Sequence, residues 1–182
     1  MNSLKYYYTE FTYQVKCLIN FFKNVWRFRK PLYQFRWWDY YTLLQFMQIA
    51  IEHMGNRTKS KGTEVDSTRI PKITKMERAS QILKNQLDNY IYMDMAEEKY
   101  GKLIDKDSNF IPLDSNPDLF TYEDNLTDEE REHNSKVFLY SVELEENEWK
   151  EFCEIIKGQG DFFEQDEWEE KFDGSGLKNW WD

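Results

Sequence analysis

The sequence predicts a mainly α-helical protein: a helical domain built on two long antiparallel helices, with an aromatic N-terminal helix and an acidic C-terminal extension. Apolar side chains recur at intervals of three and four residues through most of the first 100 residues, which is the spacing of one helical face. The charge is divided, since residues 1–84 carry 15 Lys or Arg and 6 Asp or Glu, whereas residues 85–182 carry 9 and 28. Such asymmetry is typical of a polyanion-binding half or of an acidic tail.

The first predicted helix covers residues 4–29 and is aromatic and basic. Pro31 is expected to end it, because the residue before a proline is disfavoured in the α region. From Phe11 onward its apolar residues share one helical face. They are Val15, Leu18, Ile19, Phe22, Val25 and Trp26.

The second predicted helix begins after Asp39, whose carboxylate can accept hydrogen bonds from the free amides of a first turn. Its apolar stripe runs from Tyr40 to Met54, and Gly55 is expected to end it. The polar, basic residues 55–70 predict a mobile loop. A third helix is expected from Pro71, which suits a first helical turn, to Gly101.

The C-terminal half is acidic and less regular. Residues 101–127 hold two prolines and many Asp and Asn, and they predict an irregular loop. Thr127 and Glu130 form a capping box, so another helix is expected there. Residues 137–144 fit a helix or a short strand, and we favour the helix. The helical domain therefore covers 1–157, and 158–182 form an acidic, aromatic C-terminal tail.

Composition excludes several classes of protein. A chain of 182 residues suits one domain, or one domain plus a tail. No apolar run reaches the roughly 18 residues of a membrane span, and we recognise no signal peptide. The two cysteines, Cys17 and Cys153, are expected in the core, and they make neither a disulfide framework nor a zinc site. A reducing, intracellular setting is expected.

Residues that carry catalysis are sparse. The two histidines, His53 and His133, are expected to have surface or helix-capping roles, and a cationic His53 would suit the end of its helix. No zinc-protease motif, Cys-x-x-Cys pair, calcium loop or phosphate-binding glycine loop is present. We therefore expect a protein that is not an enzyme, with no cofactor and no metal.

The basic half holds the candidate ligand site. Arginine binds phosphate oxygens through two hydrogen bonds, and aromatic rings stack on bases. A nucleotide-like small anion suits this acidic chain better than nucleic acid, which usually binds a basic domain. The alternative is an ordinary helical junction with arginines lying over core aromatics. The candidate ligand-binding residues are Arg27, Arg29, Lys30, Arg36, Trp37, Trp38, Arg57 and Lys59.

Short motifs carry a resemblance. Arg-Trp-Trp-Asp-Tyr-Tyr at residues 36–41 is followed by Leu-Leu-x-Phe-Met, a polar loop and a second long helix, and the chain closes on Trp-Trp-Asp at residues 180–182. Over about half of its length the chain thereby resembles small, mostly uncharacterised accessory proteins of tailed bacteriophages. Residues 101–135 are not part of that pattern. The resemblance implies a viral accessory protein in the cytoplasm of the infected host cell.

The leading functional expectation is a non-enzymatic anti-defence protein that binds and sequesters an anionic nucleotide-type ligand or host immune signal. Its arginines would bind phosphate, Trp37 or Trp38 would stack on a base, and a homo-oligomer would enclose the ligand. The alternative is a protein–protein inhibitor whose acidic C-terminal half occupies the basic site of a host nucleic-acid enzyme. A third hypothesis is a virion or replication component that binds single-stranded nucleic acid, with affinity falling steeply with salt.

Overall fold

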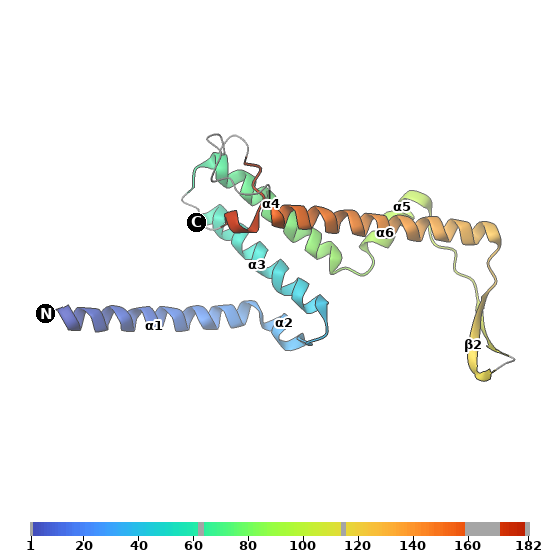
Figure 1. Cartoon of the computed structure of the whole chain (residues 1–182), viewed down its shortest axis with the longest axis horizontal. Helices are drawn as coiled ribbons and strands as arrows, with labels where there is room; N and C mark the ends of the chain where they lie inside the picture. The colour runs from blue at the N-terminus through green and yellow to red at the C-terminus, as the bar shows by residue number, and fades with distance from the viewer. Residues whose placement is uncertain (1, 62–63, 114–115, 159–171, 181–182) are drawn as a thin grey trace. The chain divides into compact units, whose positions relative to one another are not determined.

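The computed structural model describes residues 2–61, 64–113, 116–158 and 172–180. These residues are mainly helical, as the apolar periodicity predicted, and include one two-stranded sheet (Figure 1). The chain divides into two compact units, Met1–Leu87 with Glu154–Asp182, and Asp88–Cys153. No helix in the described residues combines the length and the apolar character that crossing a membrane requires.

The first unit begins with the long helix α1 (Asn2–Arg27) and the short helix α2 (Arg29–Gln34). Pro31 is buried in the first turn of α2, where a missing amide removes no helical hydrogen bond. The amide of Leu32 donates to the carbonyl of Phe28 at 2.9 Å, so the chain turns without losing helical bonding. The long helix thus ends ahead of the proline, and the proline lies in the first turn of the next helix.

The third helix, α3 (Tyr40–Lys61), begins as predicted. An Asp39 carboxylate oxygen accepts from the Tyr41 amide at 2.9 Å, which confirms the N-cap. The expected end at Gly55 is wrong, because α3 continues for six more residues. Gly55 is buried against Met76 of the next helix, and a Cβ added there would lie at an ordinary contact distance of 3.5 Å from the Met76 Cβ. The predicted loop over 55–70 is wrong for most of its length, because α3 covers residues 55–61 and the next helix begins at Asp66, five residues before the expected start at Pro71.

Helix α4 (Asp66–Gln86) packs against α3 and forms the core of the first unit. The Tyr41 hydroxyl also donates to the Leu87 carbonyl at 2.9 Å and ties the start of α3 to the end of α4. Each fully buried large apolar side chain contributes about 1.5–3 kcal/mol. The buried apolar residues of the pair are Leu44, Ile51, Met76, Ala79, Ile82 and Leu83.

The C-terminal segment 172–180 packs on the start of α4. Phe172 and Trp180 are both buried, and Trp180 lies in the short 3-10 helix η2 (Leu177–Trp180). The amide of Gly176 donates to the carbonyl of Ile155 at 2.7 Å. The predicted tail over 158–182 therefore contains a packed portion, and residues 159–171 and 181–182 lie outside the described residues.

The second unit starts where the third predicted helix is interrupted. That helix was expected to run unbroken to Gly101, but α4 ends at Gln86 and α5 covers Ile91–Tyr100. The side chain of Asp88 accepts from the Tyr90 amide at 3.0 Å, a local bond that competes with helical bonding and breaks the helix. Gly101 then ends α5 at a φ of 99°, as expected.

The long helix α6 (Asp128–Lys157) confirms the capping box. The Thr127 amide donates to Glu130 at 2.8 Å, and the Glu130 amide donates to the Thr127 hydroxyl at 3.3 Å. Residues 137–144 lie within this helix, as we favoured. Gly158 follows its last residue at a φ of 72°.

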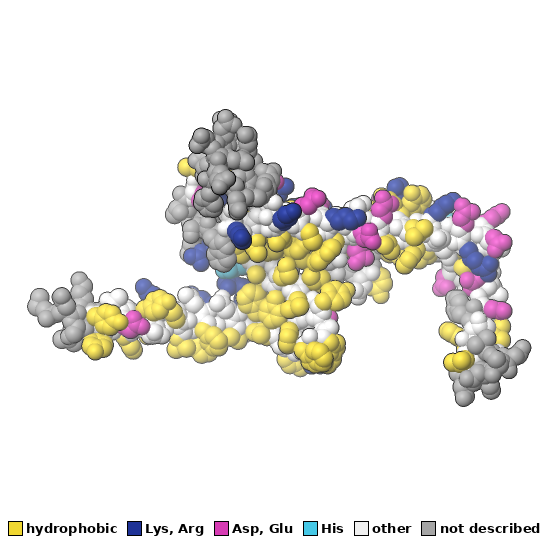
Figure 2. Space-filling model, in the orientation of Figure 1, with side chains coloured by type: hydrophobic (Ala, Val, Ile, Leu, Met, Phe, Trp, Pro, Cys, Tyr) yellow, Lys and Arg dark blue, Asp and Glu magenta, His cyan; other side chains and the backbone are white. Residues whose placement is uncertain are grey.

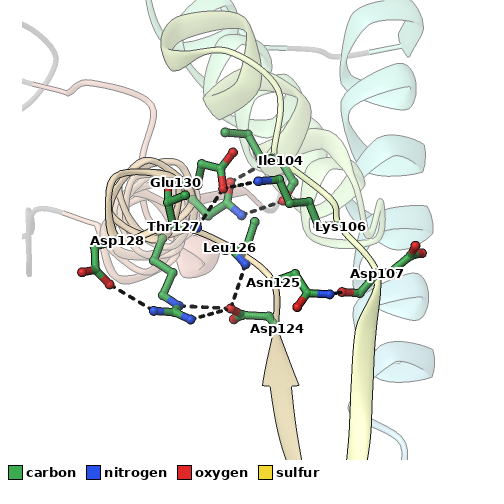
Figure 3. Close-up of polar contacts among 11 residues, drawn as sticks. Ile104, Lys106, Asp107, Asp124, Asn125, Leu126, Thr127, Asp128 and Glu130 are labelled. Atoms are coloured by element: carbon green, nitrogen blue, oxygen red, sulfur yellow. Dashed lines mark hydrogen bonds and ion pairs between the residues drawn. The ribbon is translucent and has the colours of Figure 1, made fainter.

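The expectation of an irregular loop over 101–127 is wrong, because β1 (Ser108–Leu113) pairs antiparallel with β2 (Asn116–Asp124). Pro112 lies opposite Phe120, and a two-stranded sheet tolerates proline because each strand has a free edge. Polar contacts fix the base of the hairpin (Figure 3). Lys106 bonds Glu130 at 2.6 Å, and the Arg131 guanidinium bonds Asp124 at 2.9 and 3.1 Å.

Candidate anion-binding site

The predicted ligand-binding residues fall in separate places within the first unit. Trp37 and Trp38 lie in the turn just before α3, whereas Arg57 lies 17 residues after Tyr40 on the same helix. At a rise of 1.5 Å per residue, this spacing corresponds to about 25 Å along the helix. A small ligand therefore cannot contact both the tryptophan pair and Arg57.

The structure brings together Arg27, His53 and Arg57. His53 and Arg57 are four residues apart on α3 and so share a helical face. Arg27 occupies the last turn of α1, and the next residue, Phe28, packs its ring 5.5 Å from that of Phe46 on α3. The pKa of His53 is lowered by burial first, and then by the positive charges of Arg27 and Arg57. The three side chains form a cationic cluster, named here the Arg27–His53–Arg57 cluster.

Within the described part of the chain, no carboxylate compensates this cluster. The Arg27 guanidinium donates to the uncharged side chain of Asn24 at 2.7 Å. The charged groups that shift the His53 pKa are both guanidiniums. Adjacent uncompensated cations raise the local concentration of anions and of anionic groups. The cluster is therefore chemically suited to bind phosphate or carboxylate oxygens.

Arg29 is held against Trp26, beside the cluster. Its guanidinium donates to the Trp26 carbonyl at 2.7 Å and lies 4.3 Å from the centre of the indole ring. The Trp26 side chain is nevertheless 69% exposed. Lys30, the residue after Arg29, is exposed as well. Trp26 is the aromatic residue next in sequence to Arg27, and our candidate residues did not include it.

The Arg36–Trp37–Trp38 turn is a separate exposed surface. The Asp39 amide donates to the Arg36 carbonyl at 3.0 Å and closes the turn. The two indole rings meet edge to face, with centroids 5.2 Å apart, and they are 83% and 67% exposed. Exposed rings of this kind can stack on bases. The geometry separates this stacking surface from the Arg27–His53–Arg57 cluster.

Lys59 is engaged within the fold. Its ammonium bonds Glu77 of α4 on the edge of a groove between α3 and α4. Glu52 and Lys84 also pair there at 3.3 Å, so the charges of the groove are largely compensated. The groove has a volume of about 280 Å³ and is a poor phosphate site. Its lining residues are Ile51, Glu52, Gly55, Asn56, Met76, Glu77, Ser80, Gln81 and Lys84.

Several expectations about individual residues change. A cationic His53 at a helix end is wrong, because α3 continues past it and the lowered pKa favours the neutral ring. Cys17 and Cys153 are both exposed rather than in the core. The four-residue spacing of His53 and Arg57 was the available sequence signal for the cluster. Within the described ranges, no group of His, Cys, Asp or Glu is placed to hold a metal ion.

Comparison with known proteins assigns no function, so any function is inferred from the residues described above. No known protein family matches the sequence, and neither a curated protein nor a solved structure is similar enough to match it.

Proposed function

We propose that this chain is a non-enzymatic accessory protein of a tailed bacteriophage that binds and sequesters an anionic, nucleotide-type ligand. The observation that supports this proposal is the convergence of Arg27 from α1 and Arg57 from α3 on His53. Two guanidiniums from different helices can approach one phosphate group from two sides. Guanidinium–phosphate hydrogen bonds are charge-assisted and often paired, which favours phosphate over a monovalent ion.

His53 adds a proton-dependent contact to the same site. Burial, and then the charges of the two neighbouring arginines, lower the pKa of His53, so the imidazole stays neutral more readily than that of a free histidine. A bound phosphate would oppose these effects, because a nearby negative charge favours the protonated ring. The imidazolium would then donate a further hydrogen bond to the ligand. Binding is therefore coupled to proton uptake in this proposal.

An aromatic group for the base comes from Trp26 rather than from Trp37 and Trp38. Trp26 is next in sequence to Arg27 and mostly exposed, whereas the tryptophan pair lies near the other end of α3. Stacking on an aromatic ring contributes about 1–3 kcal/mol per base. Arg29, already seated on Trp26, would extend the positive surface beside it.

Native mass spectrometry of the full chain, purified gently from phage-infected cells, tests the proposal. We expect a bound mass of a few hundred daltons that absorbs near 260 nm, and we expect its loss in Arg57→Gln. Lys102→Gln is the matched control, because it removes one exposed cation from the second unit. A chain that carries no small molecule and instead captures a host protein would overturn sequestration and favour the inhibitor alternative.

The inhibitor alternative requires a test other than truncation. Deleting residues 159–182 would also remove the packed residues Phe172 and Trp180 and would destabilise the first unit. Changing the carboxylates between residues 164 and 170 to amides keeps Phe172 and Trp180 in the chain. Loss of host-protein capture in this variant, with the small ligand unaffected, would favour the inhibitor.

A further inference from the structure

Helix α1 carries an aromatic face that is exposed along its length. Phe11 and Phe22 are 66% and 61% exposed. Figure 2 shows hydrophobic side chains gathered along the lower edge of α1 and continuing over α2. The exposed apolar residues of this face are Tyr7, Tyr8, Phe11, Val15, Leu18, Ile19, Phe21, Phe22, Val25 and Trp26.

The cations of α1 lie on the opposite side of the helix. At 3.6 residues per turn, Lys16, Lys23 and Arg27 fall within about 40° of one another, on the far side from Phe11 and Phe22. Thr9, Thr12 and Asn20 complete this polar side in the helical projection. Glu10 is the single acidic residue of α1, so the helix is positively charged in a chain with a net charge of −10.

We propose that α1 is a membrane-surface helix that lies in the plane of a bilayer with anionic headgroups. Helices of this kind bury an aromatic and aliphatic face at the boundary of headgroups and acyl chains, and they keep a Lys/Arg-rich face toward the headgroups. Tyrosine and tryptophan are the residues enriched at that depth. Because α1 has a polar side, it suits a position on the membrane surface and not one across the membrane.

A second copy of the chain fits this face less well than a bilayer does. Tyr8, Phe11, Val15, Leu18, Phe22 and Val25 alternate in steps of three and four, which is the seam of a coiled coil. The flanking positions of a two-stranded coiled coil usually carry charges that pair between helices. Thr12 and Gln14 occupy two of those six positions, and the other four hold Tyr7, Ile19, Phe21 and Trp26, which a two-stranded coiled coil would leave in water. A bilayer covers the whole width of the face.

The membrane proposal shares Trp26 with the proposed nucleotide site, and its test changes only residues outside that site. The full chain is sedimented with vesicles of phosphatidylcholine alone and with vesicles in which a quarter of the lipid is phosphatidylglycerol. We expect binding to the anionic vesicles that weakens as salt rises. Changing Lys16 and Lys23 to Gln should lower partition about fivefold for each lost cation. Arg27 and Arg57 are unchanged throughout.

A matched pair of double variants separates the aromatic face from aromatic content. Changing Phe11 and Phe22 to Ser should abolish sedimentation with anionic vesicles. Changing Tyr6 and Tyr13 to Ser should leave sedimentation unchanged, because both tyrosines are exposed but lie on the polar side of the helical projection. The thermal unfolding of both variants should match the wild type, because none of these four side chains is buried.

Three results would overturn the proposal. One is the absence of sedimentation with either type of vesicle. If light scattering then showed a dimer that the Phe11 and Phe22 changes dissociate, the face would be assigned to a second copy of the chain. Another is equal binding to both vesicle types, which would remove the role of the cations. The third is vesicle binding that survives the loss of Phe11 and Phe22, which would place the membrane contact elsewhere.

Discussion

The indole Nε1 of Trp180 donates a 2.8 Å hydrogen bond to the carbonyl oxygen of Gly174. Both residues are buried, and Gly174 has a φ of 85°. A Cβ at this glycine would lie 2.2 Å from the carbonyl carbon of Pro71 and 2.6 Å from the amide nitrogen of Lys72. The bond therefore closes residues 172–180 into a turn that fits directly on the first turns of α4.

Substituting Gly174 tests this close approach. We expect Gly174→Ala to lower the free energy of unfolding of the first unit by more than backbone strain alone, which is about 1–3 kcal/mol. The added methyl would force the segment away from Pro71 and expose Trp180. Gly101→Ala is the control, because φ is also positive there but the nearest atom is the His133 Cε1 at 3.6 Å. Equal losses in chemical denaturation would contradict the packing argument.

Core packing between α3 and α4 is tested by a matched leucine pair. Leu83 is fully buried, whereas Leu43 is 55% exposed. Leu83→Ala should lower the free energy of unfolding by about 2–5 kcal/mol, since it removes apolar contacts and leaves a cavity. Leu43→Ala should change it by no more than about 0.5 kcal/mol. Similar thermal shifts for the two variants would contradict the assigned core.

The base of the hairpin depends on Arg131. Its hydrogen bond lowers the pKa of Asp124 more than any other cause does. Lys106 likewise lowers the pKa of Glu130. Protection of β1 and β2 from hydrogen exchange should therefore be full above the ordinary carboxyl pKa and should be lost as the pH falls through the lowered values.

Hydrogen exchange measures this protection at each strand. Arg131→Gln should speed exchange in β1 and β2 at neutral pH and should reduce the further acceleration in acid. Lys136→Gln is the control, because Lys136 pairs with Glu132 within α6 and does not contact the hairpin base. Hairpin exchange that is identical in wild type and Arg131→Gln would refute the role of the guanidinium.

The stability of the first unit depends on pH through His53. Its pKa is lowered in the folded protein, chiefly by burial, so the unfolded chain binds the proton more readily. Stability should thus fall as the pH drops below the ordinary histidine value of about 6.5, down to the lowered pKa. His53→Gln should flatten this part of the stability profile. An NMR titration that gives His53 an ordinary or raised pKa would contradict the cationic surroundings.

The sequence predicted the starts of α3 and α6 correctly, whereas α4 begins at Asp66 and not at Pro71. Caps are local, and Asp39 and the pair of Thr127 and Glu130 each form the hydrogen bonds that their spacing implies. Glycine is typical of a helix end, yet Gly55 lies within α3 and is buried against Met76. That contact is tertiary, so no local pattern could reveal it. The hairpin was missed because Asp, Asn and Pro dominate residues 101–127.

The candidate site was predictable in its residue types but not in its grouping. Most of the candidate residues are exposed, but Arg27 is half-buried and Lys59 is paired with Glu77. Which of them lie together depends on the turn between α1 and α3. That turn brings Arg27 toward His53 and leaves Trp37 near the far end of α3. The clustering around His53 follows from the fold alone.

The most direct test of the account is isothermal titration of the full chain with nucleoside mono-, di- and triphosphates and cyclic dinucleotides, with adenosine as the uncharged control. We expect binding of a phosphate-bearing member and no binding of adenosine. Removing one charged hydrogen-bond donor costs about 1.5–3 kcal/mol, so Arg57→Gln should weaken binding about ten- to hundredfold, while Lys102→Gln should not. Affinity that is unchanged in Arg57→Gln, or the absence of binding across the whole panel, would contradict the Arg27–His53–Arg57 cluster as a phosphate site.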